Sequence, residues 1–246
     1  MYVTATVICS NFHFPAYFIT TRCVMITGLI APLLTPFDDK LDLDQEKFNA
    51  LAKRLLENGC AGLAPFGTTG EALSLSNQER KLALEGLMRA DIDPGVMIPG
   101  TGLCNLPDTV DLCRHAISLG CAGVMTLPPF YFKGMNDTGL YDYFSKLIEK
   151  VNDERLKIYL YHIPQVSGVG LSISLVKKLH KTFPSIVVGI KDSSGDWENT
   201  KNLLGIDGLI VYPGTELPVI DAIRLGAPGC ISATANLNSI DIAEVI

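Results

Sequence analysis

A lysine ends one of the most apolar runs of the chain. In SIVVGIKDSSGD, residues 185–196, five uncharged residues precede Lys191, and such a run is typical of a strand buried on both faces. A solvated lysine has a pKa of about 10.4, but apolar surroundings disfavour the ammonium form, so that a buried amine becomes a nucleophile for carbonyl groups. The alternatives are an ion pair with Asp192 or a side chain that reaches solvent. No other lysine ends a predicted strand, which favours a chemical role.

Two further segments carry groups that suit carbonyl chemistry. YHIP, residues 161–164, places Tyr161 at the end of another apolar run, where its phenol could transfer protons or simply pack. GTTGE, residues 67–71, offers the hydroxyls of Thr68 and Thr69 and a glycine-permitted turn whose N–H groups can face an anion. The same loop is also compatible with an ordinary turn, or with a phosphate cradle, although it has no Walker lysine.

Two neighbouring residues are expected to be structural. Glu71 is predicted to bond the backbone of its loop. His162 alternates with Tyr161 along the strand, so its side chain should face the other way and pack between sheet and helices.

The elements that must position these residues alternate regularly along the chain. Strands are predicted at 28–34, 61–66, 96–102, 122–128, 157–163, 186–191, 208–214 and 229–235. Segments with helical periodicity lie between the strands. The first has Phe48, Leu51, Ala52 and Leu55 on one face, and the second begins at a capping box formed by Ser76 and Glu79. Further helical segments are predicted near 105–119, 139–151, 172–181, 196–204 and 216–225.

This alternation predicts an α/β fold, a (β/α)8 TIM barrel, with residues 25–246 as one catalytic domain. A doubly wound open sheet is less favoured, because no GxGxxG follows the first strand. The eighth helix is expected to start near Asn238 and to stop at Ile246, so the barrel is predicted to be truncated within that helix and to expose apolar surface on its last and first strands. In a barrel, Lys191, Tyr161 and Thr68 would converge at the carboxyl ends of the strands.

Composition narrows the class of partner. The net charge of −6 argues against nucleic acid or an anionic membrane as a partner, and we expect neither. The seven cysteines include no CxxC pair and are read as reduced thiols of a cytoplasmic protein. Cys104, Cys113 and Cys121 with His115 match no common metal-ligand spacing, so no metal is predicted. Residues 1–24, with Arg22 as their only strongly charged side chain, are expected to be a non-core extension, or else a weak organelle-targeting peptide.

Together, GTTGE, YHIP and GIKDSSGD, in this order, resemble the family of dihydrodipicolinate synthase and N-acetylneuraminate lyase. The resemblance runs from about residue 25 to 246, and TGLIAPLLTPF, PPFY and GCISATAN match the same pattern. It implies a class I pyruvate-dependent aldolase on a (β/α)8 barrel. No metal or organic cofactor is implied, because the protonated imine is itself the electron sink.

The resemblance also assigns roles by position. Lys191 would form the Schiff base with pyruvate or a 2-keto acid, Tyr161 would relay protons, and Thr68 would join that relay. Thr69 and Gly67 belong to the loop that would bind the pyruvyl carboxylate. The other implied substrate-binding residues are Tyr131, Ser193, Gly214, Glu216 and Ile231. Tyr131 matches a tyrosine that family members insert into a neighbouring subunit, which implies a homotetramer built as a dimer of dimers.

Two departures from the family pattern bear on the substrate. Members that condense pyruvate with aspartate semialdehyde carry an arginine two residues after the proline of the tyrosine motif, whereas this chain has Val166, which cannot pair with a carboxylate. Sialic acid lyases tend to have an acidic pair after the glycine that follows strand 7, and here Glu216 is followed by Leu217. The favoured substrate is therefore a 2-keto-3-deoxy sugar acid.

Other functions stay open at this point. The alternatives are 4-hydroxy-tetrahydrodipicolinate (dihydrodipicolinate) synthase of lysine biosynthesis, or a catalytically inactive truncated member, because the family normally continues with further C-terminal helices. A phosphate-binding metabolic barrel is supported only by the glycine-rich strand ends.

Overall fold

The computed structural model describes residues 25–246. Within them the strands are β1 (Gly28–Ala31), β2 (Gly62–Leu63), β3 (Val124–Thr126), β4 (Ile158–His162), β5 (Val187–Asp192), β6 (Ile210–Pro213) and β7 (Gly229–Ile231). All pairings between these strands are parallel, in the orders β2-β1-β7 and β3-β4-β5-β6. The predictions for residues 1–24, which include Cys9 and Cys23, lie outside the described residues.

The predicted third strand is the one that the structure does not contain as a regular strand. Residues 97–101 occupy its position and form only isolated bridges, Leu63 with Met97 and Gly100 with Met125. Pro99 has no N–H to donate, which interrupts the ladder. The segment nevertheless bonds to both neighbours, since the N–H of Gly100 donates to Pro65 O and that of Met125 to Pro99 O, at 2.8 and 2.9 Å. The position of the predicted third strand is therefore occupied by an irregular segment that completes the barrel.

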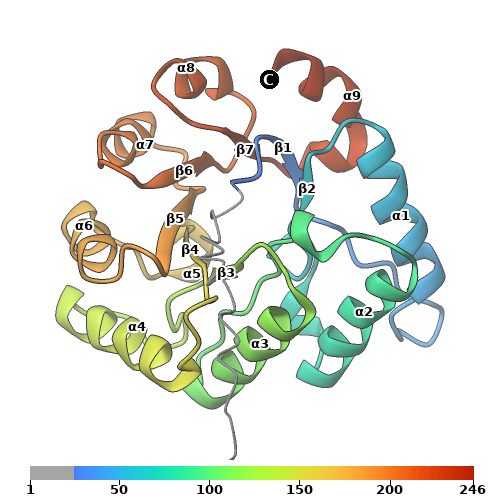
Figure 1. Ribbon diagram of the computed structural model, residues 1–246, viewed down its shortest axis with the longest axis horizontal. Helices are drawn as coiled ribbons and strands as arrows, with labels where there is room; N and C mark the ends of the chain where they lie inside the picture. Colours follow the sequence, from blue (N-terminus) through green and yellow to red (C-terminus); the bar gives the residue numbers. More distant parts are fainter. Residues whose placement is uncertain (1–24) are drawn as a thin grey trace, which may run out of the picture.

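A ring of helices surrounds these strands (Figure 1). Its members are α1 (Gln45–Glu57), α2 (Asn77–Arg89), α3 (Leu106–Leu119), α4 (Asp137–Val151), α6 (Ile173–Thr182), α7 (Trp197–Leu204), α8 (Val219–Arg224) and α9 (Ala235–Val245). Short helical turns at η1 (Ala72–Ser74), η2 (Pro94–Val96) and α5 (Pro164–Ser167) lie in the connections. The predicted capping box of Ser76 and Glu79 is present at the start of α2. The predicted (β/α)8 barrel is confirmed.

The last helix differs from its prediction. It begins at Ala235 rather than near Asn238, and Asn238 forms a kink inside it with φ of −138°. The side-chain amide of Asn236 donates to Pro32 O at 3.0 Å and so ties the start of α9 to the segment after β1. The expected exposure of the first and last strands is wrong, because Leu29 on β1 and Cys230 on β7, which face the helices, are 1% and 0% exposed. The exposed apolar residues lie on the helix itself, where Leu237 is 89% exposed.

The barrel interior is filled by large side chains below the strand ends. The rings of Tyr159 on β4 and Tyr212 on β6 lie 5.9 Å apart and are fully buried. Gly189 on β5 makes room for them, because a Cβ there would lie 2.7 Å from the ring of Tyr159. Packed aromatic rings therefore fill the barrel interior next to Lys191, which lies two residues after Gly189 on β5.

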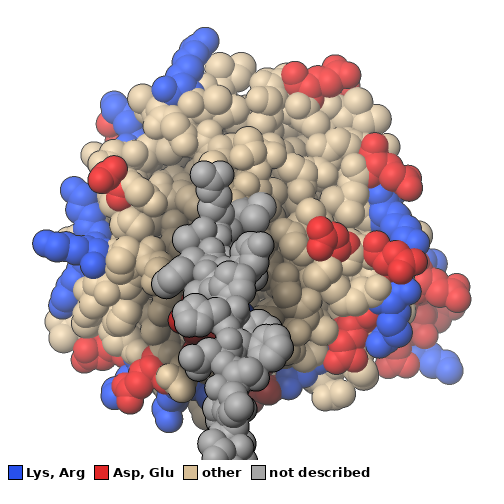
Figure 2. Space-filling view, in the orientation of Figure 1, with Lys and Arg blue, Asp and Glu red and all other residues tan. Residues whose placement is uncertain are grey.

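Charged side chains lie mainly over the outer helices on the face that Figure 2 shows. None of the helices in residues 25–246 combines the length and the apolar character needed to cross a membrane.

Candidate active site

Lys191 and Tyr161 lie side by side because β4 and β5 pair in parallel with these two residues in register. Side chains in register on neighbouring strands point to the same face of a sheet, here the barrel interior. The amine Nζ of Lys191 lies 4.6 Å from the centroid of the Tyr161 ring, and both residues are at most 4% exposed. The two groups that the sequence predicts at adjacent strand ends are therefore in contact.

Asp192 is not the partner of this lysine. It is in register with His162, one step along each strand, and so faces the helices. Its carboxylate accepts hydrogen bonds from Thr200 Oγ1 at 2.7 Å and from the side-chain amide of Asn199 at 3.0 Å, both on α7. The ion-pair alternative for Lys191 is thus excluded, and the burial of the side chain excludes the solvated one.

His162 also packs where alternation places it. Its Nδ1 accepts a hydrogen bond from the N–H of Leu171 at 3.0 Å, between the sheet and the connection to α6. Burial lowers the pKa of His162, against an opposing effect of Asp192. The expected structural role of His162 is confirmed.

Burial also lowers the pKa of Lys191, because it desolvates the ammonium, and no acid in the described part of the chain pairs with it. The Tyr161 phenol opposes this shift through its hydrogen bond and its charge. A lysine held in this way presents a larger fraction of free amine at neutral pH than a solvated lysine, which is the requirement for attack on a carbonyl carbon.

The depressed pKa predicts how stability depends on pH. Between the native pKa of Lys191 and about 10.4, the unfolded chain binds more protons than the folded one, so the folded state gains stability as pH rises through this window. Lys191→Met should therefore raise Tm at pH 7 by on the order of a few °C, and the gain should shrink toward pH 10. Differential scanning calorimetry measures it, with the exposed Lys201→Met as control. A gain that is equal at both pH values would contradict a lowered pKa.

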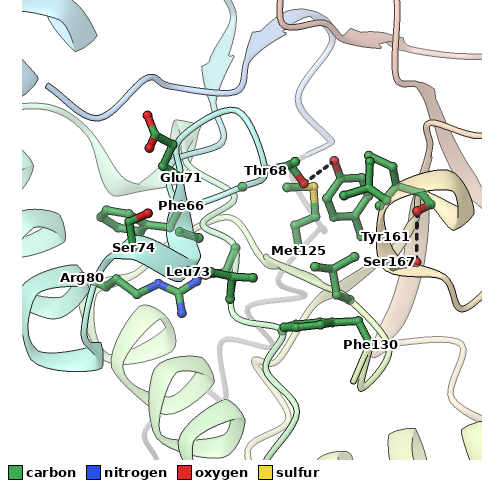
Figure 3. A pocket seen from close by; sticks show the side chains of 17 residues that line it. Phe66, Thr68, Glu71, Leu73, Ser74, Arg80, Met125, Phe130, Tyr161 and Ser167 are labelled. Atoms are coloured by element: carbon green, nitrogen blue, oxygen red, sulfur yellow. Dashed lines mark hydrogen bonds between the residues drawn. The ribbon is translucent and has the colours of Figure 1, made fainter. Parts of the chain in front are cut away.

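The loop that carries Thr68 is a compact turn between two residues with left-handed backbone. Phe66 and Glu71 have φ of 60° and 50°, a conformation that non-glycine residues seldom adopt. Inside the turn, the N–H of Glu71 donates to Thr68 O and that of Ala72 to Gly67 O, at 3.1 and 3.3 Å. The expected bond from the Glu71 side chain to this backbone is absent from residues 25–246, and Figure 3 shows the carboxylate pointing away from Thr68.

This turn places the Thr68 hydroxyl 3.2 Å from the Tyr161 phenol oxygen, the contact drawn in Figure 3. The site therefore contains one continuous chain of three groups: the amine of Lys191, the phenol of Tyr161 and the hydroxyl of Thr68. Within residues 25–246, the backbone N–H groups of Thr68 and Thr69 have no hydrogen-bond acceptor. Free N–H groups on a tight turn beside a buried amine suit an anion such as a carboxylate.

These residues open into a cavity of about 610 Å³ at the strand ends. The sequence-predicted site residues that line it are Lys191, Tyr161, Thr68, Thr69, Ser193 and Gly214. Thr215, which the sequence also suggests as a partner for substrate hydroxyls, lines it as well, and residues that sequence reasoning missed include Gln165, Asp196, Trp197 and Pro218. They lie in the connections after the strands or at the starts of the helices that follow, and their positions depend on the fold and not on periodicity.

Four predicted residues do not line this cavity. Gly67 lines a smaller adjacent cavity of about 190 Å³. Ile231 is fully buried in the barrel interior. The Glu216 carboxylate accepts a hydrogen bond from Ser232 Oγ.

Tyr131 is the fourth, and it projects from the molecule. Its ring is 75% exposed and meets Phe132 edge-on at 5.7 Å. The structure therefore gathers the predicted catalytic trio but only part of the predicted substrate-binding set.

The smaller cavity contains a cation that sequence reasoning also missed. It extends from Thr68 and Tyr161 to Arg80 on α2, as Figure 3 shows. Arg80 is in helical phase with Ala83, Leu84 and Leu87, all buried, and this phase is the signal that could have revealed a buried arginine.

No cluster of three or more His, Cys, Asp or Glu residues in the described part of the chain could hold a metal ion. The cysteines of this part, at 60, 104, 113, 121 and 230, are free thiols. Burial raises the pKa of the Cys113 thiol to about 12, so this cysteine is an inert core residue.

The fold and the site together define a class: a (β/α)8-barrel lyase of the Schiff-base type, with a buried lysine at the end of a strand. Sequence comparison agrees with this class. Residues 25–246 match the Dihydrodipicolinate synthetase family, and the chain belongs to that family. The predicted family is thereby confirmed.

Individual relatives show how far the similarity reaches. A 4-hydroxy-tetrahydrodipicolinate synthase from Thermus thermophilus is 37% identical over 214 residues, which cover 86% of this chain and 70% of the relative. The crystal structure of dihydrodipicolinate synthase from Agrobacterium tumefaciens superimposes with a TM-score of 0.86 at 36% identity, covering 89% of this chain and 77% of that one. The 2-keto 3-deoxygluconate aldolase from Picrophilus torridus gives 0.79 at 26% identity, with coverage of 87% and 76%.

Proposed function

We propose that the protein is a class I aldolase that cleaves or forms a 2-keto-3-deoxy sugar acid, with pyruvate as one partner. The observation that carries this proposal is Lys191, a buried amine without an acidic partner, in contact with a phenol at the mouth of a barrel. An amine in such a place attacks a keto carbon to give an iminium, which then accepts electrons from a neighbouring carbon–carbon bond.

The keto acid is oriented by the turn at residues 67–71. Its carboxylate accepts hydrogen bonds from the N–H groups of Thr68 and Thr69, which have no other acceptor in residues 25–246. This places the keto carbon toward Lys191, since Thr68, Thr69 and Lys191 line one cavity. Orientation of this kind makes attack effectively unimolecular.

In the cleavage direction, the Lys191 amine adds to the C2 carbonyl, and the carbinolamine loses water to form the iminium. The Tyr161 phenol gives its proton to the carbinolamine hydroxyl, which leaves as water. The C3–C4 bond then breaks, its electron pair enters the iminium to form an enamine, and the C4 hydroxyl proton passes to the Tyr161 phenolate and restores the phenol. The enamine takes a proton at C3, and water releases pyruvate from the lysine. Thr68, at 3.2 Å from the phenol, connects Tyr161 to the proton relay.

The rest of the larger cavity supports a neutral, hydroxylated partner. Among its lining residues in the described part of the chain, Lys191 is the only cation, whereas Ser193, Thr215 and Gln165 can bond hydroxyl groups. At about 610 Å³ the cavity is far larger than pyruvate requires. Similarity to the 2-keto 3-deoxygluconate aldolase from Picrophilus torridus agrees with this substrate class.

The second candidate is 4-hydroxy-tetrahydrodipicolinate synthase, the activity named for the Thermus relative. The family arginine expected to bind the carboxylate of the second substrate is replaced by Val166, which is 61% exposed. Lys191 is the only cation that lines the larger cavity in the described part of the chain, and Arg80, the cation of the smaller cavity that Val166 lines, bonds to Gly100 O. We therefore rank this activity below sugar-acid cleavage.

A homotetramer is also proposed. The 75% exposed ring of Tyr131 projects from the loop after β3, as a residue does that inserts into another subunit. We further propose a cytoplasmic location, because free thiols are typical of a reducing compartment. Sedimentation with and without pyruvate tests the assembly, and a monomer under both conditions would contradict it.

Borohydride trapping tests the chemistry. Pyruvate and borohydride should leave a reduced pyruvyl group on the Lys191 peptide, detected by mass spectrometry. If the adduct forms, the turnover of 2-keto-3-deoxy sugar acids is compared with the turnover of aspartate semialdehyde plus pyruvate. Faster turnover of the sugar acids supports the first candidate, and faster turnover of the semialdehyde supports the second. Folded protein that yields no adduct would leave a catalytically inactive family member as the better description.

A further inference from the structure

Arg80 is a buried cation whose charge is balanced by no acid within residues 25–246. The side chain belongs to α2 and is 2% exposed, and its Nε and Nη1 have no hydrogen-bond partner within residues 25–246. Burial lowers the pKa of Arg80 to about 10. An unpaired buried charge is destabilising compared with an apolar side chain of similar volume. The contacts that Arg80 does make therefore indicate what it contributes.

Both contacts lead to the base of the Thr68 turn. Nη2 of Arg80 donates to Gly100 O at 3.2 Å, and the guanidinium carbon lies 6.0 Å from the centroid of the Phe66 ring. Phe48 stacks on the same ring, with the centroids 5.8 Å apart. The Phe66 ring thus contacts both a cation and a second aromatic ring.

The main chain of Gly100 lies directly against the main chain of Phe66. A Cβ at Gly100 would lie 2.0 Å from Phe66 O, so the two main chains touch at a point where only glycine fits. Arg80 bonds the carbonyl of this same glycine. The guanidinium therefore contacts both the irregular segment 97–101 and Phe66, the residue at which the turn begins.

Phe66 needs such support because its backbone is strained. Phe66 has φ of 60°, a conformation that is unfavourable for a non-glycine residue and persists only where its surroundings impose it. Two residues later, the Thr68 hydroxyl meets Tyr161 at 3.2 Å. A relaxation of Phe66 would move the turn as a unit, because Glu71 and Ala72 bond back to Thr68 and Gly67.

We propose that Arg80 is a positioning residue: it holds Phe66 in the left-handed conformation and thereby sets the Thr68 hydroxyl against Tyr161. The catalytic consequence of this inference rests on the proposed function, whereas the structural part does not.

Hydrogen exchange tests the structural part. In Arg80→Met, which keeps an apolar chain of similar length, the amides of Glu71 and Ala72 should exchange at least about tenfold faster, while the core strands keep their protection. Arg89→Met, at the exposed end of the same helix, is the matched control and should leave the turn unchanged. Unaltered exchange at residues 66–72 in Arg80→Met would overturn the proposal, as would an equal increase over the whole barrel.

A double-mutant cycle tests the catalytic part, with the rate of borohydride trapping of pyruvate as readout. Arg80→Met should slow trapping about 10–100-fold when Thr68 is present, and less than about threefold in Thr68→Val, because Arg80 acts through that hydroxyl. Arg80→Lys, which lacks the planar fork, should resemble Arg80→Met. Equal losses in both Thr68 backgrounds would refute the coupling. If the wild type itself traps no pyruvate, the proposed function fails, and exchange still decides the positioning role.

Discussion

Lys191→Met is expected to abolish the formation of a trappable pyruvyl adduct and to lower kcat for keto-acid cleavage at least about 10⁴-fold. The reason is that the amine is the only nucleophile that can form the iminium, and no other lysine lines either cavity in the described part of the chain. Methionine keeps the buried apolar stem, so the fold should survive. Steady-state kinetics and borohydride trapping measure the two losses, with circular dichroism to confirm folding.

The control for this variant is Lys201→Met on α7, whose amine is bonded to the exposed Glu198. It should keep both trapping and turnover. Residual activity near the wild-type level in folded Lys191→Met protein would remove the basis of the Schiff-base proposal.

Tyr161→Phe is expected to lower kcat by about 10²–10³-fold, the usual contribution of one general acid–base group. The ring would still pack beside Lys191, but the link from the phenol to Thr68 would be lost. A second effect follows from electrostatics. The phenol raises the pKa of Lys191 against the effect of burial, so its removal should lower that pKa further. The acid limb of the kcat/KM profile should then move to lower pH.

Kinetics over a pH series measure both effects. Tyr141→Phe is the matched control, because this tyrosine lies on α4 and its hydroxyl bonds to Thr182 outside the site. An acid limb that moves to higher pH in Tyr161→Phe, or a kcat that stays unchanged, would show that Tyr161 is a packing residue.

Much of the barrel could be predicted because its elements follow simple periodicities. Seven of the eight predicted apolar runs contain a strand, and each expected helix lies close to its predicted range. The exception at 97–101 depends on Pro99 and on the close approach of Gly100 to Phe66, which no pattern in the run itself displays. The expected exposure of the end strands failed because the last helix starts at Ala235, earlier than predicted, and packs against β1.

The residues of the site also divide into those that the sequence could predict and those that it could not. Lys191 and Tyr161 were predictable because each ends a strand, and strand ends converge in a barrel. Residues such as Gln165 on α5 and Trp197 at the start of α7 have positions that only the folded connections after the strands determine. Arg80 was missed for another reason: one arginine in phase with an apolar helix face is easily assigned to the surface, although its phase was the evidence for burial.

The central place of β1 in its sheet has a consequence for synthesis on the ribosome. β1 pairs with β2 on one edge and with β7 on the other, so one edge of this early strand has no partner until Gly229–Ile231 have been translated. An unpaired edge on a nascent chain is prone to pair with other chains. Strands β3 to β6 follow one another in order and can assemble as they emerge. Closure of the barrel is therefore a late event, and this edge is where a holding chaperone would be needed most.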